Sequence, residues 1–259
     1  MAALQSSAAV NGTLQVSAGT LNLVSVDGLS HTAGALTMTG GGLTLGGTND
    51  GSLTVSGATT LSGGTLTMDT SGATPDLLDL NGGLTFGGAF TLTIGITGGV
   101  IRVASAASPV WDDTPSTGVI DPTGGTIQLD PTVVTTYGIT TKASTRFNNL
   151  VLAGGSNSVI FNPNQNLVID GNMTLSGGTF SWDDTLAPTT GTLAHSVAGT
   201  FTQSGGLMAT NRQAGVGSTL TVTGDISVTA GSFDNVNSAG SVTVGASDEW
   251  IVGANVTVT

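Results

Sequence analysis

The chain is built from short segments in which apolar residues occupy every second position. The stretch from Asn166 to Trp182 holds two such segments and the start of a third, separated by turns of Gly, Asn and Asp. Alternation over about five residues between turn residues is typical of half-buried β-strands. No segment combines a helical apolar period with capping residues. The pattern therefore predicts an all-β protein.

The same unit recurs along the chain at a nearly constant interval. Segments that begin with Gly and a small residue and then alternate apolar with polar residues stand at 12–18, 34–40 and 64–70. Leu14 and Leu36 hold equivalent positions, about 22 residues apart, and a period of this length indicates a repeat architecture. At this period the chain should contain roughly ten to twelve coils.

We predict a right-handed parallel β-helix, that is, a β-solenoid. Each coil would lie on the one before, so that Leu stacks on Leu and Thr on Thr. Identical charges stacked about 4.8 Å apart would repel each other, and only 8% of the residues are charged. Tight corners favour Gly and Asn. Five asparagines suit ladders at such corners: Asn148, Asn149, Asn162, Asn164 and Asn166. A β-prism or a pair of β-sandwiches is the alternative fold.

We expect one solenoid domain over residues 1–259. Its regular coils should occupy 1–104 and 147–259, where the repeat is clear. The segment 105–146 is looser and rich in proline, which cannot donate to a strand ladder. We expect loop excursions at 105–146 and at 182–191.

The charge pattern excludes several classes of partner. The formal net charge is -12, and the basic residues are Arg102, Lys142, Arg146 and Arg212. Four scattered cations cannot neutralise a nucleic-acid backbone, so no nucleic-acid partner is expected. No apolar run is long enough for a transmembrane helix, so no membrane insertion is expected. The N-terminal segment MAALQSSAAVNGTL lacks the basic and apolar regions of a signal peptide, which leaves the export route open.

Acidic residues recur beside each tryptophan. Adjacent acids with Thr hydroxyls suit a hard cation, so calcium is the one candidate cofactor. Its candidate ligands are Asp112, Asp113, Asp183 and Asp184. The same residues could instead be solvated turn acids, or acid/base carboxylates of a glycosidase. The tryptophans, Trp111, Trp182 and Trp250, could stack on sugars, although core packing fits them better. His31 and His195 lie in no metal-binding motif, and we expect a structural role for both.

The two ends of the repeat pattern are candidate assembly surfaces. No amphipathic helix caps the pattern at either end, and an open coil exposes an unpaired strand edge. Protomers that stack coil on coil would form a homopolymer through these edges. The apolar residues of the expected interface are Leu14, Val16, Leu21, Leu23, Val256 and Val258.

Four motifs carry a resemblance to a known class of protein. They are FNNLVLAGG at 147–155, NLVIDGNMTLSGG at 166–178, GTFTQSGG at 199–206 and STLTVTGDISVTAGSF at 218–233. They resemble the Gly/Thr-rich β-strand repeats of large secreted bacterial proteins, among them autotransporter passengers and filamentous-haemagglutinin-like adhesins. The resemblance implies a parallel β-helix outside the cell or on its surface, used for adhesion, coating or filaments. It carries over no catalytic residues.

We therefore expect a structural extracellular protein, a subunit of a filament or surface fibre, and not an enzyme. The alternative is an adhesin segment that binds glycans or surfaces through the loops at 105–146 and 182–191. A third hypothesis is a polysaccharide-degrading β-helix enzyme.

Overall fold

The protein folds as a parallel β-solenoid in the computed structural model, and the residues described contain strands and no helix. None of these residues belongs to a helix long and apolar enough to cross a membrane. The structure describes residues 2–3, 6–23, 28–46, 50–68, 75–94, 98–118, 120–121, 123–133, 135–156, 159–181, 193–209, 218–234, 249–252 and 256–258.

The chain divides into two compact units, Met1–Gln128 and Leu129–Thr259, and the division falls within β11 (Thr126–Leu129). The strands of the first unit are β1 (Ala2–Ala3), β2 (Ala9–Val16), β3 (Thr20–Asn22), β4 (Leu29–Thr44), β5 (Gly51–Val55), β6 (Thr59–Met68), β7 (Leu77–Leu80), β8 (Leu84–Ile94), β9 (Val100–Val103) and β10 (Trp111–Asp112). The strands of the second unit are β12 (Thr136–Thr140), β13 (Asn149–Ala153), β14 (Ile160–Pro163), β15 (Val168–Ile169), β16 (Met173–Gly177), β17 (Thr179–Ser181), β18 (Leu193–Val197), β19 (Phe201–Ala209), β20 (Ser218–Val222), β21 (Ile226–Asp234), β22 (Glu249–Val252) and β23 (Val256–Val258).

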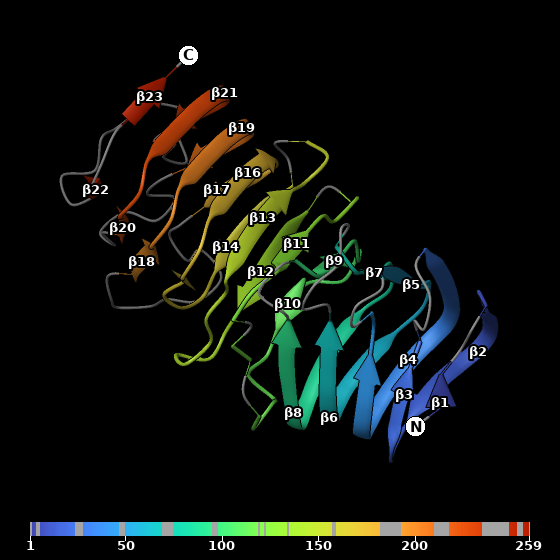
Figure 1. The fold of residues 1–259 in the computed structure, drawn as a ribbon. Coiled ribbons are helices and arrows are strands. Elements are labelled where there is room, and N and C mark those ends of the chain that lie inside the picture. The colour runs from blue at the N-terminus through green and yellow to red at the C-terminus, as the bar shows by residue number, and fades with distance from the viewer. Residues whose placement is uncertain are drawn as a thin grey trace. The chain divides into compact units, whose positions relative to one another are not determined.

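The first unit stacks its strands in parallel on three faces. One face pairs β2 with β4, β4 with β6, and β6 with β8. A second face begins with β1 on β3 and continues through the later residues of the same long strands. The third face pairs the start of β4 with β5, then β7 and β9. Figure 1 shows β8, β6, β4 and β3 side by side.

A column of glycines turns the long strands from the first face to the second. Gly41, Gly64 and Gly88 have positive φ values of 69°, 89° and 51°, a region that glycine enters without steric cost. A Cβ on Gly64 would lie 2.4 Å from the carbonyl oxygen of Gly41 in the coil before. Each coil therefore needs glycine both for its own backbone and for the close approach of its neighbour.

The core of the first unit is a set of apolar rows that run across the coils. Leu43, Leu66 and Leu92 occupy one row in register and are all buried. Outward positions stack in the same way, since Thr60 pairs with Thr85. The predicted stacking of like residues on like is confirmed at these positions.

The second unit has the same plan. β13, β16, β19, β21 and β23 pair in sequence on one face, and Figure 1 shows the first four of them stacked. β12, β14, β17 and the later residues of β19 and β21 form another. β15, β18, β20 and β22 form the third.

Asparagines join the coils of the second unit, but through the backbone. The N–H of Asn172 donates to Oδ1 of Asn149 at 2.8 Å, and the N–H of Thr200 donates to Oδ1 of Asn172 at 2.8 Å. The N–H of Ala194 donates to Oδ1 of Asn166 in the same manner. The expected corner role of asparagine therefore takes the form of side-chain oxygens that accept amide protons of the next coil.

The described part of the chain makes about eight turns, fewer than the ten to twelve that the period predicted. Coil length varies along the chain. The hydrogen bond between the N–H of Asn172 and Oδ1 of Asn149 spans 23 residues, but the next one, between the N–H of Thr200 and Oδ1 of Asn172, spans 28. The corners tolerate extra residues because the entropic cost of closing a loop rises only slowly with its length. The handedness of the coils and the extent of a single domain stay predictions.

Candidate functional site

The strand β2 is an edge strand within the described residues. It pairs with β4 in parallel from Ala9 to Val16, and no described strand pairs with its other side. Its side chains are mostly exposed, and Val10 has 37% of its surface in contact with solvent. An exposed edge of this kind presents backbone groups that can pair with a further strand.

Successive residues of β2 direct their backbone N–H and C=O groups alternately toward β4 and toward the open side of the strand. The N–H of Thr32 donates to the carbonyl of Ala8 at 3.0 Å, so residue 8 faces β4. The N–H of Leu36 donates to the carbonyl of Ala58, which lies on the side away from β2. The backbone groups of the next residue, Thr37, therefore point toward β2. Thr37 is in register with Gln15. In a parallel ladder the bonds of Thr37 then go to the residues on either side of Gln15. The N–H and C=O of Gln15 therefore face the open edge.

The predicted assembly residues differ in their exposure. Val16 and Leu23 are buried, at 4% and 2% exposed, so they belong to the core of the coil. Leu14 and Leu21 are half-buried, and the backbone of Leu21 is covered on one side by β1. Val256 and Val258 lie in β23, which pairs with β21. Val16 and Leu23 thus point into the coil interior, while the open groups of β2 are backbone atoms.

The segment before β2 is fastened to the next coil by polar side chains. The N–H of Ala8 donates to Nδ1 of His31 at 3.2 Å, across 23 residues. The N–H of Ser30 donates to Oγ of Ser7 at 3.1 Å. His31 is buried, at 3% exposed, and its side chain lies in register with Leu53 of β5. The imidazole thus occupies a core position and holds the chain at the start of β2.

His195 repeats this arrangement in the second unit. It is 2% exposed, and its Nδ1 accepts the N–H of Leu167 at 3.0 Å, across 28 residues. It stands in register with Leu220, and its ring lies edge-on to Phe180 with 6.1 Å between ring centroids. Both histidines therefore bind a backbone N–H of the preceding coil, and the expected structural role fits their placement.

The candidate calcium residues Asp112 and Asp113 lie at the end of β10. Asp113 is buried, and its Oδ2 accepts the indole N–H of Trp111 at 3.2 Å. Asp112 is half-exposed, and its Oδ1 accepts the N–H and the hydroxyl of Thr114 at 3.1 and 2.6 Å. Both carboxylates are thus engaged by neighbours in the chain.

The rest of the calcium prediction concerns residues outside the part of the chain that the structure describes. Asp183 and Asp184 lie there, as do Trp182 and the loop 182–191. Among the described residues no group of three or more acidic or histidine side chains is placed to hold a metal ion. Calcium binding stays a prediction.

Trp111 is a core residue. Its side chain is fully buried, and its ring lies 4.8 Å from that of Phe86 between centroids. Phe86 in turn lies 5.9 Å from Phe90. The core-packing alternative is therefore confirmed for Trp111, which cannot stack on a sugar from this position.

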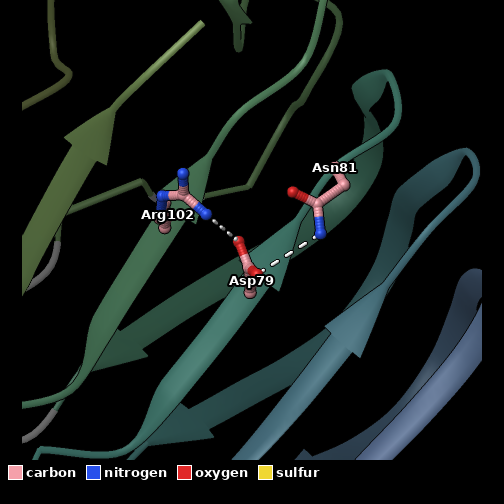
Figure 2. Close-up of polar contacts among 3 residues, drawn as sticks. All are labelled: Asp79, Asn81 and Arg102. Atoms are coloured by element: carbon pink, nitrogen blue, oxygen red, sulfur yellow. Dashed lines mark hydrogen bonds and ion pairs between the residues drawn. The ribbon is translucent and has the colours of Figure 1, made fainter. Parts of the chain in front are cut away.

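Two ion pairs that sequence reasoning missed join adjacent coils. Nη1 of Arg102 lies 3.1 Å from Oδ1 of Asp79, which is 23 residues earlier and in register with it (Figure 2). Arg146 binds both oxygens of Asp170, 24 residues later. The signal was available, because each Arg stands about one repeat period from an Asp.

Comparison with known proteins leaves the family open. No protein-family model matches the chain, and no curated protein or solved structure matches it either. What can be stated of its class is therefore that it is a β-solenoid repeat protein.

Proposed function

We propose that this protein is a structural extracellular β-solenoid that assembles into a filament or surface fibre by adding the strand edge of one copy to that of the next. The observation that carries the proposal is the open side of β2, an eight-residue parallel strand that is paired on one side only within the described residues. A second copy is the natural occupant of that edge, because its coils have the same spacing and strand direction.

The partner edge in the second unit is β23. Its described neighbour is β21, to which it is parallel, with Ile226 opposite Val256 and Val228 opposite Val258. A strand of this unit added to β2 of another copy would continue a parallel ladder. Head-to-tail contacts that do not close into a ring produce open fibres.

The outward rows of the first unit favour stacking of many coils. Gln15, Thr37, Thr60 and Thr85 stand in register on one face, and none of them carries a charge. Stacked uncharged hydroxyls avoid the repulsion that identical charges would create between coils. The extracellular location rests on the resemblance to secreted β-repeat proteins.

Electron microscopy of the purified chain over a range of concentrations, with and without calcium, tests the proposal. We expect unbranched fibres whose diffraction shows the strand spacing of about 4.8 Å. Short particles of one size at every concentration would overturn the proposal. Fibres that form only with calcium would instead indicate that the acidic residues beside the tryptophans take part in the assembly.

Two variants of Gln15 test whether the open side of β2 is the assembly interface. Gln15→Pro removes the N–H that faces the open side of β2 while leaving the N–H groups of Leu14 and Val16 in place, so we expect it to stay dispersed. Gln15→Thr places at this position the residue found at Thr37 and Thr60 in the same row, and it should assemble like the unchanged chain. Fibres of Gln15→Pro would show that β2 is not the interface.

A further inference from the structure

The strand β2 turns a corner at a position where later coils have glycine. Gly12 lies midway between Val10, on the third face, and Leu14, on the first face. Gly57 and Gly82 hold the same place in later coils, between β5 and β6 and between β7 and β8. The open edge of β2 therefore continues around a corner of the coil.

Glycine is needed at the inner corners because of the coil that precedes each of them. None of Gly34, Gly57 and Gly82 has a φ in the left-handed region. A Cβ on Gly57 would lie 2.4 Å from the carbonyl oxygen of Gly34, and a Cβ on Gly82 would lie 2.2 Å from that of Gly57. A Cβ on Gly34 would lie 2.6 Å from the carbonyl oxygen of Asn11. These corners have no room for a side chain, since the backbone of the preceding coil approaches too closely.

The second unit has the same kind of corner between the face of β15 and the face of β13. Gly199 lies there between β18 and β19, and Gly224 lies between β20 and β21. A Cβ on Gly199 would lie 2.6 Å from the carbonyl oxygen of Gly171, and a Cβ on Gly224 would lie 2.5 Å from that of Gly199. In both units, glycine at this corner permits the close approach of one coil to the next.

Gly12 is a glycine of this corner without a preceding coil against it. A Cβ on Gly12 would meet nothing within 4 Å, and its φ lies outside the left-handed region. At Gly34 and Gly57 the added Cβ would point toward the preceding coil, so at Gly12 it would point to the open side of β2. No described part of the chain therefore requires glycine at this position.

Val10 lacks a covering neighbour in the same way. It begins an inward row whose other members are at most 3% exposed: Ala33, Val55, Leu80 and Val103. Val10 itself is 37% exposed, because no described strand lies on the open side of β2. The carbonyl of Ala8 faces β4, so the backbone groups of the next residue, Ala9, face the open side. The third face of this coil is therefore open to a partner, as the first face is.

We infer that an incoming coil covers both faces of β2 and turns the corner with it. One of its backbone carbonyls then lies against Gly12, and its inward side chains cover Val10. The inference rests on the proposed function and defines the partner more closely. That partner is the end coil of a second copy, because a single extended strand would not follow the corner. Residues 2–23 carry no charged side chain, so they place no like charge against the incoming coil.

The variant Gly12→Ala tests this inference. We expect its midpoint of thermal unfolding to equal that of the unchanged chain, because the added methyl group meets nothing within 4 Å in the chain itself. The critical concentration for fibres, measured by sedimentation, should rise at least about tenfold, since an overpacked contact weakens an affinity by about this factor.

Thr13→Ala is the matched control. It alters the same corner and supplies the residue that stands in register in β4, Ala35. We expect this variant to assemble at the same concentration as the unchanged chain. Equal effects of Gly12→Ala and Thr13→Ala on the critical concentration would overturn the inference.

The inference and the proposed function fail in different ways. Gly12→Ala fibres at the ordinary concentration, together with a dispersed Gln15→Pro, would overturn the inference and retain the edge of β2 as the interface. A lower unfolding midpoint of Gly12→Ala, or its failure to fold, would also overturn the inference, because the chain itself would then need the glycine. An unchanged chain that forms no fibres would refute the proposed function, and the inference with it.

Discussion

Arg102 and Asp79 stand opposite each other on neighbouring strands, β9 and β7, with 3.1 Å between Nη1 and Oδ1. Asp79 also accepts a hydrogen bond from the amide of Asn81 at 3.3 Å (Figure 2). Two identical charges at these positions would repel each other across the coils, but Arg102 and Asp79 carry opposite charges and attract. The ion pair is therefore compatible with the register in which β7 and β9 are paired.

The ion pair should contribute modestly to stability. The side chains of Arg102 and Asp79 are 31% and 15% exposed, so solvent screens their attraction. We expect Arg102→Met to lower the free energy of unfolding by about 0.2–1 kcal/mol, as measured by urea denaturation. Asp79→Asn in the same double-mutant cycle should show a coupling energy of the same size. A coupling near zero at low salt would show that the contact contributes nothing.

The corner glycines should be far less replaceable than exposed ones. Gly64 has a φ of 89°, and a Cβ there would lie 2.4 Å from the carbonyl oxygen of Gly41. We expect Gly64→Ala to destabilise the first unit by more than about 1 kcal/mol, because both the backbone and the next coil must shift. Gly155→Ala is the matched control, since a Cβ at that position meets nothing within 4 Å. Equal effects of the two substitutions on thermal unfolding would contradict the corner argument.

Gln203 should stabilise the second unit through buried side-chain hydrogen bonds. Its side chain is fully buried, and its Nε2 donates to the carbonyls of Gly206 and Ser232 at 3.2 and 3.1 Å. Gln203→Leu would match the row partner Leu175 but leave both carbonyls without this donor. We expect a loss of about 1–3 kcal/mol in unfolding free energy.

The matched control for Gln203→Leu is Thr202→Ser, on the outward side of the same strand. It should lower the free energy of unfolding by less than about 0.5 kcal/mol. A variant Gln203→Leu as stable as the unchanged chain in urea would show that burial of the leucine offsets both lost bonds.

Tyr137 should make the second unit sensitive to alkali. Burial raises the pKa of Tyr137 above its ordinary value of 10.0, and its hydroxyl donates a hydrogen bond to the carbonyl of Val133 at 2.8 Å. The folded state therefore keeps the phenol proton at a pH where the unfolded chain has lost it. Stability is fully present below about pH 10 and is lost as the pH rises toward the folded pKa.

The chain contains one tyrosine, so its ionisation can be followed by ultraviolet absorbance without assignment. We expect the midpoint to lie above that of free tyrosine in the folded protein and to return to it in urea. Tyr137→Phe should remove the part of the alkaline loss due to this residue. A midpoint at the free value in the folded protein would contradict the prediction.

The alternation of apolar and polar residues and the recurrence of Leu14, Leu36 and their equivalents were sufficient to predict parallel coils with like residues in register. These are local properties that repeat, and a repeat of about 22 residues has few ways to bury its apolar side except by stacking on its neighbours. His195 alternates with Leu193 and Val197 in the sequence, and all three side chains are buried.

The tertiary structure alone decided which atoms meet across coils. The contacts of His31 with Ala8, of Arg102 with Asp79 and of Asn149 with Asn172 each span 23 residues of sequence. The corners between the strands vary in length, so the register at each point depends on loops that follow no fixed period. The open side of β2 is likewise a property of the stack, because whether an edge is paired depends on which strands lie beside it and not on the residues it contains.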